Sequence, residues 1–356
     1  MPRGQGAALE RSAAFVVLDA ALSPDESRIA SVGQDARLWM RDVRTGRLIF
    51  SVSTGASTMA ALAFHPGGDM VACVSDDGVI AFFDAWNGEK LGIFSGHEAI
   101  LRDVCFHPDG RWLLSLDNTG TVKRWHLGTR EPPVVYRDTE ALLAAAYSPN
   151  NATIYVGAFH QGPVLLDAAT FMRLDASAQS PAFRSVSEIV ISPDGESIAV
   201  SGPAAQRNEW SVWICDRNGA IRQPDIGAGG HPAFSSDSRL VAVGQDEHTL
   251  AICDVQAGER VRSFTIADAM IGALCWSADN TELIVGCSDG SVRVLDAQSG
   301  ACTRRFDAHS SAIRQVLLTP QQDVLLTTCP EAPSIKAWSW PSGALRFDIT
   351  EAADPQ

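Results

Sequence analysis

One turn motif recurs along the whole chain at a nearly constant spacing. A short apolar segment runs into Ser-Pro-Asp-Gly, or a degenerate version of it, eight times, and the anchor residues of these turns are Pro24, Pro66, Pro108, Pro149, Pro193, Ser236, Ala278 and Pro320. Successive anchors are separated by 42, 42, 41, 44, 43, 42 and 42 residues. A repeat of about 40–45 residues is typical of a four-stranded propeller blade. The spacing therefore predicts an all-β propeller.

Residues 278–306 show how one unit is built. Turns at 278–280, 288–290 and 296–300 separate the segments ELIVGC, SVRVLD and ACTRRF. Gly, Asp, Asn and Ser favour such turns because they tolerate left-handed backbone or bond their own main chain. The first two of these strands are apolar and the last is polar, as expected for a blade packed between neighbours with a solvated rim.

The first and last units decide the number of blades. The first already contains a fourth strand, GRLIFSV, and the eighth ends in GALRFDI. Eight complete units predict eight four-stranded antiparallel blades, with the last packed on the first; seven blades plus an appended unit is the alternative. We expect one propeller over residues 14–350, a flexible segment or linker at 1–13 and a tail at 351–356.

The internal spacing singles out the fifth unit. From the turn anchor to the residue that closes the third strand there are 18 residues in six units, 19 in the last unit and 23 in the fifth. The five extra residues fall within GPAAQRNEW, between the second and third strands. Because propellers carry function on loops, this enlarged loop is the first place to look for a binding site.

Composition limits the class of partner and compartment. A net charge of −14 repels phosphate backbones, so we expect no nucleic-acid partner. No apolar run approaches the ~18 residues of a membrane helix, and the N-terminus does not read as a secretory signal. Eight cysteines without metal or CxxC spacing predict free thiols in a reducing compartment, here the cytoplasm. Three lysines against 25 arginines hint at a bacterial source, and the chain is consistent with a domain of a larger polypeptide.

The units resemble the WD-40 repeat family over roughly residues 14–350. The third unit carries Gly96-His97, His107-Pro108-Asp109-Gly110, Ser115 and Trp125, which match the family's Gly-His, turn, Ser/Thr and Trp positions. The resemblance implies a hydrogen-bonded tetrad of His, Ser/Thr, Asp and Trp in each blade. The matching residues are His97, Ser115 and Trp125 in the third unit, His309, Thr328 and Trp338 in the eighth, and Ser31 and Asp35 in the first.

Departures from the family pattern are frequent. The turn position for Asp is Thr119 in the third unit, and the Trp position is Arg41 in the first. We therefore expect the tetrad to be incomplete in every unit and cohesion to depend mainly on apolar packing.

No constellation predicts catalysis. The sequence contains no nucleophile elbow, phosphate loop or zinc-protease motif, and most aspartates occupy turn positions. His126, His160, His231 and His248 have no structural position in the repeat, but they lie in different units, which does not favour a metal site. The turns DVRTG, DVQAG and DAQSG are also similar to those of quinoprotein propellers, where a docking tryptophan follows; here the stretches end in Phe50, Phe94, Phe264 and Phe306.

The surface offers a binding hypothesis instead. We expect partners on the face formed by two kinds of loop: those that join the second strand of a unit to its third, and those that join its fourth strand to the first strand of the next unit. This face is called the loop face below. Its candidate contacts are Trp210, Arg207, Asn208, Glu209, Met59, His97, Glu98, Phe159, His160, Glu247, His248 and Met270. Trp86 and Trp340 share a turn position on the opposite face, either as a second patch or as lids over the blade edge.

The sequence thus predicts a non-enzymatic scaffold without a cofactor, which binds a basic or neutral protein on its loop face. The alternatives are a pyrroloquinoline-quinone-dependent oxidoreductase and a small-ligand sensor that uses the axial channel.

Overall fold

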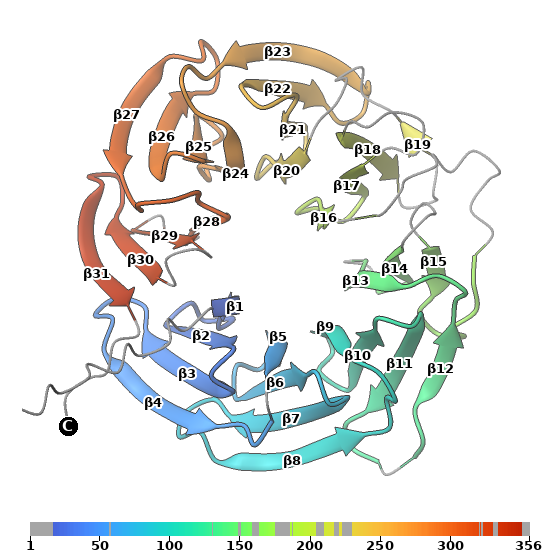
Figure 1. The fold of residues 1–356 in the computed structure, drawn as a ribbon. Helices are drawn as coiled ribbons and strands as arrows, with labels where there is room; N and C mark the ends of the chain where they lie inside the picture. The colour runs from blue at the N-terminus through green and yellow to red at the C-terminus, as the bar shows by residue number, and fades with distance from the viewer. Residues whose placement is uncertain are drawn as a thin grey trace, which may run out of the picture.

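The computed structural model describes residues 17–56, 58–129, 131–148, 151–158, 164–174, 186, 188–203, 210–216, 221–222, 230–319, 321, 323–329 and 334–350. Within these residues, 31 strands form eight antiparallel sheets arranged in a ring (Figure 1). The predicted eight-bladed propeller is confirmed, and the arrangement of seven blades plus an appended unit is wrong.

Each blade is a meander of consecutive strands, called a to d from the axis outward. The first four blades are β1 (Val17–Leu22), β2 (Arg28–Gly33), β3 (Arg37–Asp42) and β4 (Leu48–Ser53); β5 (Met59–Phe64), β6 (Met70–Ser75), β7 (Val79–Asp84) and β8 (Lys90–Ser95); β9 (Leu101–Phe106), β10 (Trp112–Asp117), β11 (Thr121–His126) and β12 (Val134–Arg137); and β13 (Leu142–Tyr147), β14 (Thr153–Ala158) and β15 (Val164–Asp167). In blade 4 the described residues give three strands, and Arg173 forms an isolated bridge with Leu166.

The other four blades follow the same order. They are β16 (Glu188–Ile191), β17 (Ser197–Pro203), β18 (Trp210–Asp216) and β19 (Ile221–Arg222); β20 (Gly230–Phe234), β21 (Leu240–Gly244), β22 (Thr249–Asp254) and β23 (Glu259–Thr265); β24 (Ile271–Trp276), β25 (Glu282–Cys287), β26 (Ser291–Asp296) and β27 (Cys302–Asp307); and β28 (Gln315–Leu318), β29 (Val324–Cys329), β30 (Ser334–Ser339) and β31 (Ala344–Thr350). In Figure 1 the a strands surround the axis, and blade 8 lies beside blade 1.

The core lies between the blades. Each of eight apolar clusters joins the b and c strands of one blade to the a and b strands of the next. The ring closes through the cluster in which Val324, Leu326 and Ala337 of blade 8 pack with Ile29 and Val43 of blade 1. Strands b and c are buried on both faces and therefore nearly continuously apolar, whereas d strands such as β8 and β27 are mostly exposed.

A phenylalanine on strand d packs against a glycine in the next blade's c–d turn. A β-carbon added to Gly300, whose φ is 73°, would lie 2.1 Å from the ring of Phe264. The same pairing joins Phe50 to Gly88, Phe306 to Gly343 and Phe347 to Gly46, the last across the ring closure. Phe50, Phe264 and Phe306, which follow turns similar to those of quinoproteins, thus have a packing role here. Phe94 also packs, since its ring stacks on that of Trp125 with centroids 5.1 Å apart.

Candidate functional site: the loop face and the axial cavity

The polar tetrad of blade 3 is complete, contrary to expectation. The imidazole of His97 lies 2.7 Å from Asp117 and 2.7 Å from the hydroxyl of Ser115, which also accepts a hydrogen bond of 2.8 Å from the indole of Trp125. The acid comes from the end of β10 instead of the turn position of Thr119. Burial lowers the pKa of His97 despite its acidic partner, so at neutral pH the ring is an uncharged link.

Blade 8 has the same linkage one residue away from the predicted place. The hydroxyl of Thr327, not that of Thr328, lies 2.8 Å from the imidazole of His309 and accepts a hydrogen bond of 3.0 Å from Trp338. Adjacent residues of a strand point to opposite faces, so the predicted residue was out by one position. In blade 1, Asp35 accepts a 2.8 Å hydrogen bond from Trp39, which lies two residues before the position where the repeat pattern places a tryptophan.

Two of the predicted partner contacts are structural residues. Met59 is 1% exposed and belongs to the core cluster between blades 1 and 2, because the first residue of strand a points into the blade interface. His97 is equally occupied, in the tetrad of blade 3. Arg207, Asn208, Glu209, Phe159 and His160 lie outside the described residues.

Besides Trp210, four predicted contacts are exposed on the loop face: Glu98, Glu247, His248 and Met270. Hydrogen bonds hold the last three together. The imidazole of His248 lies 2.9 Å from the carbonyl oxygen of Ala269, and the amide of Ile271 donates to the backbone carbonyl oxygen of Glu247. The amide of Met270 donates to the hydroxyl of Ser288. The b–c turn of blade 6 is thereby fixed to the d–a loop before blade 7.

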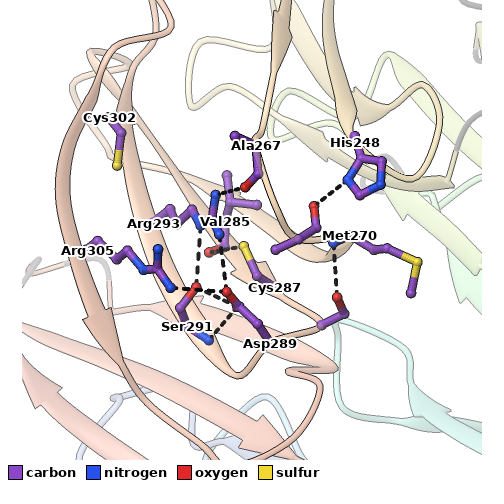
Figure 2. Close-up of polar contacts among 12 residues, drawn as sticks. His248, Ala267, Met270, Val285, Cys287, Asp289, Ser291, Arg293, Cys302 and Arg305 are labelled. Atoms are coloured by element: carbon purple, nitrogen blue, oxygen red, sulfur yellow. Dashed lines mark hydrogen bonds and ion pairs between the residues drawn. The ribbon is translucent and has the colours of Figure 1, made fainter.

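A charged network in blade 7 supports this loop (Figure 2). Asp289 accepts hydrogen bonds from Ser291, from Arg293 at 3.1 Å and from Arg305 at 3.3 Å. Arg293 also donates to the carbonyl oxygen of Ala267, next to the loop that carries Met270. Although burial opposes it, these hydrogen bonds hold the pKa of Asp289 below its ordinary value. The network occupies the place that the His-Ser-Trp linkage takes in blade 3.

Trp210 begins β18 at the end of the enlarged loop, and half of its surface faces solvent. Its indole stacks on the imidazole of His231 in blade 6, with ring centroids 6.3 Å apart and planes at 24°, and covers Gly230. The side chain is 43% exposed. The stack fixes the orientation of the indole on the neighbouring blade and leaves its other side available.

The Trp210–His231 pair lies beside a cavity of about 400 Å³ between the a strands of blades 5 to 8. Its charged lining residues are Glu188, His231 and Arg314, and Glu188 lies 3.8 Å from His231. Burial raises the pKa of Glu188, and burial together with the charge of Arg314 lowers that of His231. Sequence analysis assigned His231 no structural position in the repeat and did not single out Arg314.

Two carboxyl groups of the inner strands also escaped sequence analysis. Asp19 on β1 accepts a 2.9 Å hydrogen bond from the amide of Leu62 on β5, and Asp103 on β9 accepts one of 3.0 Å from Ala145 on β13. Burial raises the pKa of Asp19 to about 6 and that of Asp103 to about 7, in spite of these bonds. Charged residues inside otherwise apolar a strands were the available signal.

The two tryptophans of the opposite face differ. Each covers an arginine of the preceding blade: the guanidinium of Arg28 lies 3.5 Å from the ring of Trp86, and that of Arg304 lies 4.3 Å from Trp340. Trp340 is 8% exposed and is a lid, whereas Trp86 is 58% exposed.

Within the described residues, no three His, Cys, Asp or Glu side chains lie close enough together to hold a metal ion. The same residues include no helix long and apolar enough to cross a membrane. All eight cysteines are free thiols, and only Cys302 is exposed.

Two family models match parts of the chain: the description "WD domain, G-beta repeat" at residues 46–84 and 88–126, and "Anaphase-promoting complex subunit 4 WD40 domain" at residues 234–321. By structure, the chain is similar to the computationally designed Ika8 protein, with a TM-score of 0.74 and 17% identity over 92% of this chain and 98% of that one. At that identity the likeness concerns the fold.

Three curated relatives are similar over shorter segments. They are WD repeat-containing protein SL1-17 of Schistosoma mansoni (26% identical over 32% of the chain), Protein HIR1 of Eremothecium gossypii (24% over 45%) and Methylosome protein WDR77 of Xenopus laevis (31% over 23%). The matches span 37%, 23% and 25% of the lengths of these relatives.

Proposed function

Because the chain belongs to the WD-40 repeat family, we propose that it acts as a non-enzymatic scaffold that binds a protein partner on its loop face. The observation that carries the proposal is Trp210, an indole held in one orientation by His231 yet 43% exposed. Interface hot spots are enriched in tryptophan. Glu247, His248 and Met270 add exposed contacts on loops fixed by hydrogen bonds, so little conformational entropy is lost on binding.

The partner we propose is basic or neutral. The net charge of −14 and the exposed carboxylates of Glu98 and Glu247 favour such a partner by electrostatic steering. The same charge argues against nucleic acid and against anionic membrane surfaces. A cytoplasmic location, a bacterial source and membership of a larger polypeptide remain predictions from the sequence.

The test compares the same substitution on the two faces. Trp210→Ala removes the proposed anchor, and Trp86→Ala removes an equally large exposed indole from the opposite face. Affinity capture followed by mass spectrometry should recover partners with wild type and Trp86→Ala and lose them with Trp210→Ala, by about tenfold or more. Equal recovery by the two variants would contradict the assignment of the loop face.

A second candidate function is a small-ligand sensor in the axial cavity. The observation that favours it is the meeting of Glu188, His231 and Arg314 at a cavity of about 400 Å³. The quinone-dependent alternative has less support, because Phe50, Phe264 and Phe306 pack against glycines of the next blade. A ligand retained in the cavity after purification, seen by crystallography or mass spectrometry, would favour the sensor.

A further inference from the structure

We propose that a cavity between blades 3 and 4, on the face opposite to the loop face, binds a small monocarboxylate. The cavity has a volume of about 260 Å³ and is lined by His107, Trp112, Arg124, Tyr147, Asn151, Ala168 and Ala169. These residues belong to the a–b and c–d turns and the adjoining strand ends, so the cavity is separate from the proposed partner surface.

Arg124 breaks the pattern of the repeat at this cavity. It lies on β11 opposite Leu114, at a place in strand c that is buried and apolar in the other seven blades. The corresponding residues are Met40, Phe82, Leu165, Ile214, Ile252, Val294 and Ala337. A guanidinium at such a place costs free energy unless it is well paired.

The hydrogen-bond partners of Arg124 are carbonyl oxygens and not carboxylates. The guanidinium donates to the carbonyl oxygens of Ala168 and Ala169 and lies 4.7 Å from the ring of Trp112. Among the described residues, no carboxylate forms an ion pair with it. Its buried Nε has no hydrogen-bond partner within the protein. The site therefore offers a guanidinium that forms no ion pair with the described residues and one buried donor without a hydrogen-bond partner.

Tyr147 is a second departure from the pattern. The residue two places before the turn anchor is apolar in the other units: Leu22, Phe64, Phe106, Ile191, Phe234, Trp276 and Leu318. Tyr147 is only 8% exposed, and its buried hydroxyl has no hydrogen-bond partner within the protein. Burial raises its pKa well above the ordinary value, so the hydroxyl stays protonated and is a donor at neutral pH.

Asn151 supplies a free acceptor, its side-chain oxygen, as a comparison with the same turn position in unit 7 explains. Its backbone is left-handed, with φ of 58°, which explains an asparagine in the turn. At the same turn position in unit 7, the side-chain oxygen of Asn280 accepts a 2.7 Å hydrogen bond from the amide of Ser236 in the preceding blade. In unit 3, which precedes unit 4, the position of that serine is occupied by Pro108. Proline has no N–H, so the side-chain oxygen of Asn151 has no hydrogen-bond partner.

The three groups specify the class of ligand. Arg124 and Tyr147 can donate to the two oxygens of one carboxylate, and Asn151 can accept from an N–H or O–H beside it. Asp109 and Asp167 interact electrostatically with Tyr147 and Arg124, which disfavours a doubly charged phosphate. An N-acylamino or hydroxy acid has the required carboxylate, single charge and neighbouring donor.

The probe is N-acetylglycine, and N-acetylglycinamide, which lacks the carboxylate, is its control. In isothermal titration calorimetry the acid should bind wild type with a millimolar Kd and the amide should not. Tyr147→Phe should weaken binding about tenfold or more, because it removes one hydrogen bond to a charged group. Arg124→Met, which restores the apolar pattern, should abolish binding.

Two controls keep the result interpretable. Tyr136→Phe removes a hydroxyl that donates to Asp138 at 2.8 Å, outside the cavity, and should keep wild-type affinity. Without ligand, Tyr147→Phe should melt at or above the wild-type temperature, since its hydroxyl makes no hydrogen bond within the protein. The proposal is overturned if the acid does not bind at about 10 mM, if the amide binds equally well, if Tyr147→Phe binds as wild type does, or if that variant melts lower.

Discussion

At the scale of single residues, one buried hydroxyl in each of two blades forms hydrogen bonds with two other side chains. Ser115 and Thr327 each contact a histidine of the preceding loop and accept from a tryptophan of strand c. Thr327→Val should therefore lower the free energy of unfolding by about 2 kcal/mol, because the buried imidazole and indole lose their partner. Urea unfolding measures this, and Thr328→Val, one residue along, should change it by less than about 0.5 kcal/mol. Equal losses would contradict the position assigned to the tetrad.

Only some residues of the tetrad can be predicted from the sequence. Gly-His and Trp mark the tetrad because their spacing from the turn is fixed, and His97, Ser115 and Trp125 do meet. Thr327 and Thr328 are the same residue type, so only the strand register decides which of them points toward His309 and Trp338. The degenerate turn of unit 8 makes that register hard to read from the sequence. Asp117 was not assigned to the tetrad, because it closes the tetrad from a strand end and not from the turn.

At the scale of elements, the c–d turn of one blade depends on strand d of the blade before it. Gly300 has a positive φ, and a β-carbon there would overlap the ring of Phe264. Gly300→Ala should cost about 1–3 kcal/mol of stability through strain and overpacking. Gly92 is the matched control, since a β-carbon there meets nothing within 4 Å and the substitution should be nearly neutral. Similar effects of the two changes in thermal or urea unfolding would argue against this inter-blade contact.

The elements themselves could be predicted because each unit repeats the same turn chemistry and alternation. The contact between Phe264 and Gly300 could not, since it joins residues of different repeats with no sequence signal beyond their recurrence. The same holds for Trp210, whose place on His231 depends on how two blades are rotated against each other.

At the scale of the whole molecule, the inner ring contains carboxyl groups that favour protonation. The pKa values of about 6 for Asp19 and about 7 for Asp103 lie above the ~3.9 of an unfolded chain. Their contribution to stability is therefore complete below about pH 4 and is lost as the pH rises through 6 to 7. Between pH 5 and pH 8, wild type should lose about 2–3 kcal/mol more than Asp103→Asn in urea unfolding. The same slope in both proteins would show that Asp103 ionises as an exposed carboxyl does.

The ring itself was predictable from the period of the turns and from the complete first and last units. Its closure follows because an open end would leave the apolar faces of blades 1 and 8 exposed, and residues such as Ile29 and Leu326 bury each other instead. The cavity between blades 3 and 4 was not predictable. Arg124 stands out as an exception only when the strand pairing shows which residues of the eight blades are equivalent.

The most direct test of the account asks which face touches a protein in the cell. A photo-crosslinking amino acid is placed at Glu98 or Glu247 on the loop face, and at Trp86 or Glu89 on the opposite face, all of them exposed positions. Irradiation should give discrete covalent adducts from the two loop-face positions and none from the other two. Adducts from the opposite face alone, or from no position, would contradict a scaffold that binds its partner on the loop face.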